Sequence, residues 1–133
     1  MLPTKIVAIG AGSASFGLNT LATILRSERL RGSRLALVDR DAQKLAVVER
    51  LAQRLNREWQ AEMTISAHTR HDHALDDAEF VIVSIEVPPR EQLWKMDWEI
   101  RLKHGVRQPY AENGGPGGFA HAARNIPPIM EIV

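Results

Sequence analysis

Cysteine is absent from the 133 residues, so the chain has no disulfide and no thiolate metal ligand. It also has no excess of one charge, because 17 Lys and Arg residues stand against 16 Asp and Glu residues without a concentrated basic stripe. This balance gives no electrostatic reason to expect nucleic acid or an anionic membrane as a partner. The apolar run after Lys5 ends at Gly10, too short for a signal peptide or a membrane span. We therefore expect a cytoplasmic protein with a small-molecule ligand.

Four short apolar runs alternate with segments of helical periodicity. We predict strands at residues 6–9, 35–38, 63–67 and 80–85, and a short helix or turn at residues 72–77. We predict helices from residue 16 to about 29, from the N-cap Asp41 to about 59, from 90 to about 104, and from about 118 onward, the last kinked or interrupted at Pro127 and Pro128. This alternation indicates parallel pairing with right-handed crossovers. The sequence therefore predicts an α/β fold with a doubly wound, Rossmann-type sheet.

A glycine-rich turn, residues 10–17, joins the first predicted strand to the first predicted helix. Gly10 permits a tight turn, and Gly12 lets the backbone approach a pyrophosphate, to which the helix N-terminus offers free N–H groups. The third position of the G-x-G-x-x-G pattern holds Ser15, which departs from the pattern but is small, and Gly17 lies close by. The turn therefore predicts a dinucleotide site. The alternative is a turn that only packs the helix on the strand.

Asp39 follows the second predicted strand, where a carboxylate can accept hydrogen bonds from the adenosine ribose hydroxyls. Because a carboxylate repels a 2′-phosphate, Asp39 predicts NAD rather than NADP as the cofactor. The neighbouring Arg40 leaves the other choice open, since a guanidinium can pair with that phosphate. In the alternative interpretation of the turn, Asp39 only starts the next helix.

Two further segments are candidates for ligand contacts. Glu86 follows the fourth predicted strand, at the sheet edge where ligands of open α/β folds bind, and we expect its loop to face the nicotinamide half of the cofactor. Residues 112–118 combine Glu112 and Asn113 with four glycines and one proline, which allows close backbone approach to a ligand. We expect Glu112 and Asn113 to hold sugar hydroxyls, with a hinge or a helix cap as the alternative.

The histidines and tryptophans each admit two interpretations. His68, His71 and His73 suggest a metal site, but their spacing matches no known closed site, and a solvated turn beside an edge strand is the preferred interpretation. Trp94 and Trp98 could stack on a sugar ring, yet two tryptophans four apart on a helix more often belong to the core or to a subunit contact. We therefore assign no metal ligand in this chain and expect both tryptophans in the core.

Segments along the whole chain form a specific pattern in their order and spacing. They are residues 5–13 with Phe16, 30–33, 35–39, 78–83, 86–87, 97–100, 102–106, 115–119 and 124–127. With this pattern the chain resembles glycoside hydrolase family 4, the NAD-dependent α-glucosidases, α-galactosidases, α-glucuronidases and 6-phospho-glycosidases. The glycine turn alone does not separate this family from lactate and malate dehydrogenases, whose fold it shares. Gly-Pro-Gly-Gly-Phe at residues 115–119, followed by Arg-Asn-Ile-Pro at 124–127, favours the glycosidases.

The resemblance implies an NAD site, a divalent metal such as Mn²⁺, and hydrolysis of a glycoside through transient oxidation at sugar C3, elimination and addition of water. In the family, the metal-binding Cys and His and the acid and base residues lie downstream of the matched region. We therefore assign no catalytic residue in this chain and expect those residues beyond Val133.

The same resemblance implies how the chain is organised. Residues 1–133 are then an incomplete NAD-binding domain, inactive without the catalytic half, of a protein that forms dimers or tetramers. The residues expected to bind the cofactor are Gly10, Gly12, Ser13, Ser15, Phe16 and Asp39, with Glu86 near the nicotinamide ribose.

Two other functions stay open on the sequence. An NAD-dependent 2-hydroxy-acid dehydrogenase would use the same fold and cofactor turn, and NADH would accumulate in step with its product. A non-catalytic nucleotide-binding module would need nothing beyond the residues present.

Overall fold

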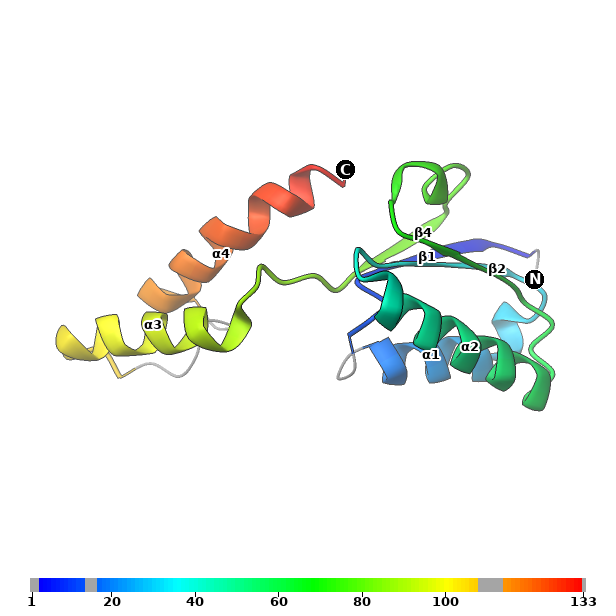
Figure 1. Cartoon of the computed structure of the whole chain (residues 1–133), viewed down its shortest axis with the longest axis horizontal. Coiled ribbons are helices and arrows are strands. Elements are labelled where there is room, and N and C mark those ends of the chain that lie inside the picture. Colours follow the sequence, from blue (N-terminus) through cyan, green and yellow to red (C-terminus); the bar gives the residue numbers. More distant parts are fainter. Residues whose placement is uncertain (1–2, 14–16, 108–113, 133) are drawn as a thin grey trace. The chain divides into compact units, whose positions relative to one another are not determined.

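The computed structural model describes residues 3–13, 17–107 and 114–132 (Figure 1). The chain forms two compact units, residues 1–84 and residues 85–133. Within the described ranges, no helix is long and apolar enough to cross a membrane.

The first unit is built on a parallel sheet. Its strands are β1 (Lys5–Ile9), β2 (Arg34–Val38), β3 (Thr64–His68) and β4 (Phe80–Val83), in the order β3-β2-β1-β4. All neighbouring pairs are parallel, and the order matches the first part of the 3-2-1-4-5-6 order of dinucleotide-binding domains. The predicted α/β sheet is confirmed. The predicted bounds are wrong in detail, because β3 lies one residue later and β4 ends at Val83 instead of residue 85.

Two helices of this unit, α1 (Gly17–Arg26) and α2 (Ala42–Glu58), lie on the same face of the sheet (Figure 1). The second predicted helix is confirmed, and its apolar face packs on the sheet, since Leu45, Val48 and Ala52 are buried in the core with residues of β1, β2 and α1. A single helix to residue 29 was expected after the glycine turn, and this is wrong. Ser27 has an extended backbone, so α1 ends at Arg26 and a separate 3-10 helix, η1 (Glu28–Leu30), follows.

Asp41 caps α2 as predicted. Its Oδ1 accepts hydrogen bonds from the backbone N–H groups of Gln43 and Lys44, each at 3.1 Å. Its Oδ2 lies 3.3 Å from Nζ of Lys44. The hydrogen bonds from the Lys44 backbone and side chain, with the charge of Lys44 and the Gln43 N–H, hold the pKa of the Asp41 carboxyl below its ordinary value of 3.8.

This cap gives a pH-dependent contribution to stability. Because the pKa is lowered in the folded state, the contribution is complete above pH 3.8 and is lost as the pH falls through the folded-state pKa. Asp41→Asn keeps an oxygen acceptor but does not titrate. We therefore expect the stability difference between wild type and D41N, measured by urea unfolding at several pH values on either side of 3.8, to shrink in acid. A difference of constant size at every pH would contradict this account of the cap.

The second unit contains two helices that pack against each other, α3 (Arg90–Lys103) and α4 (Gly115–Met130) (Figure 1). The helix α3 has the predicted bounds to within one residue. The start predicted for the last helix, about residue 118, is too late, because α4 begins at Gly115 and holds Pro116 in its first turn, where a missing N–H costs nothing. The predicted interruption at Pro127 and Pro128 is also wrong. Both prolines lie within α4, which continues to Met130 although each of them removes one backbone N–H from the helix.

Candidate cofactor site

The turn after β1 is fastened to the end of β2. Gly10 has a φ of 84°, a conformation that favours glycine. The N–H groups of Gly10 and Ala11 both donate to the Val38 carbonyl, at 2.8 and 3.0 Å. The chain therefore turns sharply at the carboxyl end of the sheet, the edge at which open α/β folds bind their ligands.

Gly12 lies directly against Asp39. Its N–H donates to Oδ2 of Asp39 at 2.7 Å, while Oδ1 of the same carboxylate accepts from the N–H of Asp41 at 2.9 Å. A Cβ on residue 12 would lie 2.7 Å from Asp39 Oδ2 and 3.0 Å from Cβ of Lys44. The structure thus brings together two residues predicted to bind the cofactor, and a side chain at position 12 would force the turn or the Asp39 carboxylate to move.

Gly17 has a role that the sequence analysis did not assign. A Cβ there would lie 2.7 Å from the Ala11 carbonyl oxygen, and its N–H donates to the Ser13 carbonyl at 3.0 Å. Gly17 therefore allows the close packing of helix on turn that the third glycine of the pattern provides in dinucleotide sites. The signal was the glycine at the start of the helix, two residues after Ser15. Ser15 and Phe16, both predicted to bind the cofactor, lie outside the described residues.

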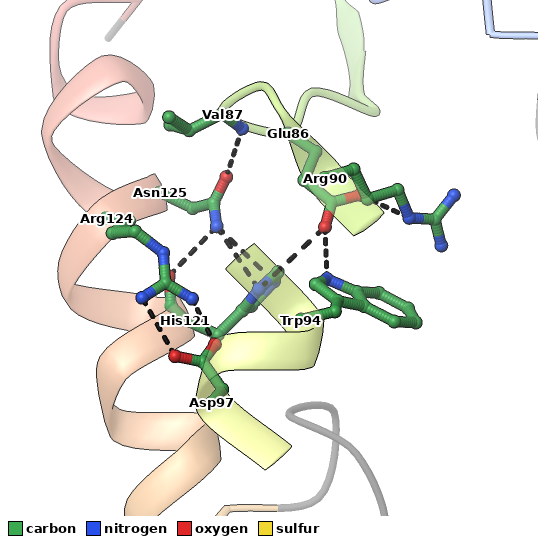
Figure 2. Close-up of polar contacts among 8 residues, drawn as sticks. All are labelled: Glu86, Val87, Arg90, Trp94, Asp97, His121, Arg124 and Asn125. Carbon is green, nitrogen blue, oxygen red and sulfur yellow. Dashed lines mark hydrogen bonds and ion pairs between the residues drawn. The ribbon is translucent and has the colours of Figure 1, made fainter. Parts of the chain in front are cut away.

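Glu86 belongs to the second unit, where side chains of both helices surround its carboxylate (Figure 2). Oε1 accepts a hydrogen bond from Nε1 of Trp94, and Oε2 lies 2.9 Å from Nε of Arg90 in an ion pair. Nδ1 of His121, on α4, lies 3.9 Å from Oε1. These contacts hold the carboxylate in a fixed position. Because the side chain of Glu86 is a quarter exposed, it still reaches the surface of its unit.

Two further contacts join the elements of this unit (Figure 2). The side chain of Asn125 accepts a hydrogen bond from the Val87 N–H at 2.9 Å and donates to the His121 carbonyl at 2.9 Å. Arg124 makes a two-point ion pair with Asp97, whose side chain is only 5% exposed. A buried, doubly hydrogen-bonded pair of this kind fixes the alignment of α3 and α4.

The prediction that Trp94 and Trp98 belong to the hydrophobic core is wrong for the core that the described residues form. Both are half-buried, and neither belongs to the apolar core cluster, which lies in the first unit. The guanidinium of Arg90 lies 4.3 Å from the Trp94 ring centre, and that of Arg101 lies 4.0 Å from the Trp98 ring centre. The arginines one helical turn away were the available signal for these cation–π contacts.

The three clustered histidines do not converge on one point. His68 ends β3 and shares a hydrogen bond with Ser66, while His71 and His73 lie in the turn around η2 (Asp72–Ala74) and face Asp72 and Asp76. Among the residues that the structure describes, no group of three His, Asp or Glu side chains is placed to hold a metal ion.

Besides Ser15 and Phe16, three positions named in the sequence analysis lie outside the described ranges. Glu112 and Asn113 are the predicted sugar contacts. Val133 is the residue beyond which we expect the catalytic groups. The structure therefore tests neither the sugar contacts nor the place of the catalytic residues, and both stay predictions.

Comparison with known proteins places this geometry in a family. Residues 5–133 match the model of the family 4 glycosyl hydrolases. An α-glucosidase of Erwinia rhapontici is 47% identical over 131 residues, which cover 98% of this chain and 29% of that protein. An α-galactosidase of Bacillus subtilis is 33% identical, over 96% of this chain and 30% of that protein. The chain thus spans less than a third of the length of these relatives.

A solved structure gives the same fold. The 6-phospho-β-glucosidase of Thermotoga maritima, determined with manganese, NAD⁺ and glucose-6-phosphate, superposes with a TM-score of 0.78 at 27% identity, over 97% of this chain and 30% of that one. A 6-phospho-α-glucosidase from gut microorganisms, with NAD and Mn²⁺, gives a TM-score of 0.78 at 22% identity, over 98% of this chain and 29% of that one. From its match over residues 5–133, we conclude that the chain belongs to family 4 of the glycosyl hydrolases.

Proposed function

We propose that this chain is the amino-terminal, NAD-binding part of an NAD-dependent glycoside hydrolase. The observation that carries the proposal is the contact between Gly12 and Asp39, which leaves no room for a side chain beside a carboxylate at the cofactor edge of the sheet. The structure of the Thermotoga maritima relative with NAD⁺ supports it. Membership of the glycosidase family speaks against a 2-hydroxy-acid dehydrogenase.

The described residues fit a dinucleotide. Gly10, Gly12 and Ser13 would bring backbone to the pyrophosphate, and Asp39 would accept the ribose hydroxyls. Each Asp39 oxygen already accepts one backbone N–H and, as a carboxylate oxygen, can accept a second donor. When bound, NAD supplies a hydride acceptor for transient oxidation of the sugar. We place Glu86 at the nicotinamide ribose, and we keep Ser15 and Phe16 as further cofactor contacts.

The rest of the catalytic machinery belongs, in this proposal, to residues beyond Val133. The described residues offer no ligand set for the divalent metal, which two relatives bind as manganese. The edge strand β4 exposes apolar side chains, with Phe80 59%, Val81 45% and Val83 38% exposed. These exposures support an incomplete domain whose sheet continues. The proposed sugar contacts remain Glu112 with its neighbour Asn113, and a cytoplasmic homo-oligomer remains the proposed form of the enzyme.

The cofactor preference tests the assignment of Asp39. We expect the full-length protein to bind NAD more tightly than NADP, because a 2′-phosphate would face the Asp39 carboxylate, and we expect Asp39→Ala to reduce that preference. Calorimetric titration with both cofactors measures it. Equal or tighter binding of NADP by the wild type would mean that Arg40 governs this subsite, and the ribose contact of Asp39 would be wrong.

A further inference from the structure

The loop between β4 and α3 has few backbone N–H groups that can hold it in place. Pro88 and Pro89 have no N–H, so Val87 is the last residue before α3 whose backbone N–H can fasten the loop. That N–H donates to Oδ1 of Asn125, at 2.9 Å, across 38 residues of sequence. The side chain that fixes the backbone of the loop is therefore on α4, and Glu86 is the residue directly before the fastened one (Figure 2).

Asn125 is itself fixed. It is 7% exposed, and its Nδ2 donates to the His121 carbonyl one turn earlier on α4 at 2.9 Å. The two hydrogen bonds determine which way the amide points, because the reversed amide would face N–H with N–H and oxygen with oxygen. Its oxygen is thus directed at the Val87 N–H, and losing it would leave that N–H without this acceptor.

The same face of α4 also reaches the side chain of the loop. His121, four residues before Asn125, lies 3.9 Å from the Glu86 carboxylate and packs edge-on against Trp94, with ring centres 6.3 Å apart. Trp94 in turn donates to Glu86. One turn of α4 therefore holds the backbone of the Glu86 loop and lies beside its carboxylate, which Trp94 and Arg90 of α3 bind directly. The Asp97–Arg124 pair keeps α4 aligned with α3.

We propose that Asn125 is a positioning residue for the cofactor, which acts by holding the loop that presents Glu86. This inference rests on the proposed function, in which Glu86 contacts the nicotinamide ribose. Asn125 does not touch the cofactor, so its effect on NAD binding passes through Glu86. A residue that only stabilised the fold would not show this dependence.

The test is a double-mutant cycle of NAD affinity in the full-length protein. We expect Asn125→Ala to weaken NAD binding about tenfold, the equivalent of one hydrogen bond to an otherwise unsatisfied group. In a Glu86→Ala background, the same change should have almost no effect. Asn125→Asp, which keeps an acceptor for the Val87 N–H, should recover part of the affinity, and it serves as the test variant if N125A does not fold.

Asn56 provides a matched control. Its side chain exchanges two hydrogen bonds with the backbone of Met63, at 2.8 and 3.0 Å, next to the amino end of β3 and away from the cofactor edge. Asn56→Ala should therefore lower the thermal unfolding temperature without changing NAD affinity. Three results would overturn the inference: unchanged NAD affinity in N125A, unchanged affinity in E86A, or an equal loss from N125A with and without Glu86. Absence of NAD binding by the wild type would instead refute the proposed function.

Discussion

We expect the full-length protein to lose glycoside cleavage by about a thousandfold or more when its divalent metal is removed, because a Lewis acid supplies several kcal/mol of charge stabilisation. Removal of NAD should have an effect at least as large, since no other oxidant for the sugar is present in the proposed reaction. The measurement is cleavage of an aryl glycoside by protein stripped with a chelator and by gel filtration, with NAD⁺ and Mn²⁺ added back singly and together. Only the combination should restore the rate.

The 133-residue chain should be assayed under the same conditions as the full-length protein. It offers no metal ligand set among the residues that the structure describes, so we expect no cleavage by the short chain under any combination of NAD⁺ and Mn²⁺. Efficient cleavage by the short chain, or by the stripped full-length protein, would contradict the proposal that this chain supplies the cofactor site and that residues beyond Val133 supply the metal ligands and the catalytic groups.

Gly12→Ala should weaken NAD binding by about a hundredfold, the equivalent of about one hydrogen bond to a charged group. The added Cβ would lie 2.7 Å from Asp39 Oδ2 and 3.0 Å from Lys44 Cβ, so either the turn or the carboxylate must move. Both are proposed cofactor contacts, and the Asp41 N–H holds the carboxylate from its other side. Calorimetric titration of the full-length protein with NAD measures the loss.

Gly32→Ala controls for general damage to the fold. Gly32 has a φ of 75° with no atom within 4 Å of the added Cβ, and it lies before β2, at the opposite end of that strand from Asp39. The substitution should cost about 1 kcal/mol of stability through backbone strain and leave NAD affinity unchanged. Wild-type affinity in G12A, or an equal loss in G32A, would show that the Gly12–Asp39 contact does not shape the cofactor site.

The sequence was sufficient to predict the parallel sheet and the cofactor edge because their signals are local. The apolar run of β1, the glycines after it and Asp39 after β2 can each be recognised from a few neighbouring residues. The α2 cap at Asp41 is local in the same way. These features need no knowledge of which segments meet in space.

The contacts that complete the site depend on segments far apart in the chain. Gly12 meets Asp39 across 27 residues, and this bond follows from the register of β1 against β2. Val87 meets Asn125 across 38 residues, through the packing of α4. No spacing rule identifies such partners. Asn125 is part of the family pattern at residues 124–127, but nothing in the sequence indicates its contact with Val87.

The tryptophans show how a correct local observation gave a wrong conclusion. Trp94 and Trp98 do lie one turn apart on α3, but the face that they share meets charged groups. Arg90 and Arg101 cover the rings, and Glu86 takes the Trp94 N–H. Apolar area alone favoured the core, whereas the cation–π contacts depend on the arginines one turn away.

The most direct test of the central claim follows the C2 hydrogen of the sugar. The full-length protein is incubated in deuterated water with an aryl glycoside, NAD⁺ and Mn²⁺, and the released sugar is analysed by NMR and mass spectrometry. Transient oxidation at C3 makes the C2 proton acidic, so the account predicts deuterium at C2 that requires NAD⁺. Cleavage that proceeds with no deuterium at C2 would contradict the account and would leave this chain a nucleotide-binding fold without a part in the chemistry.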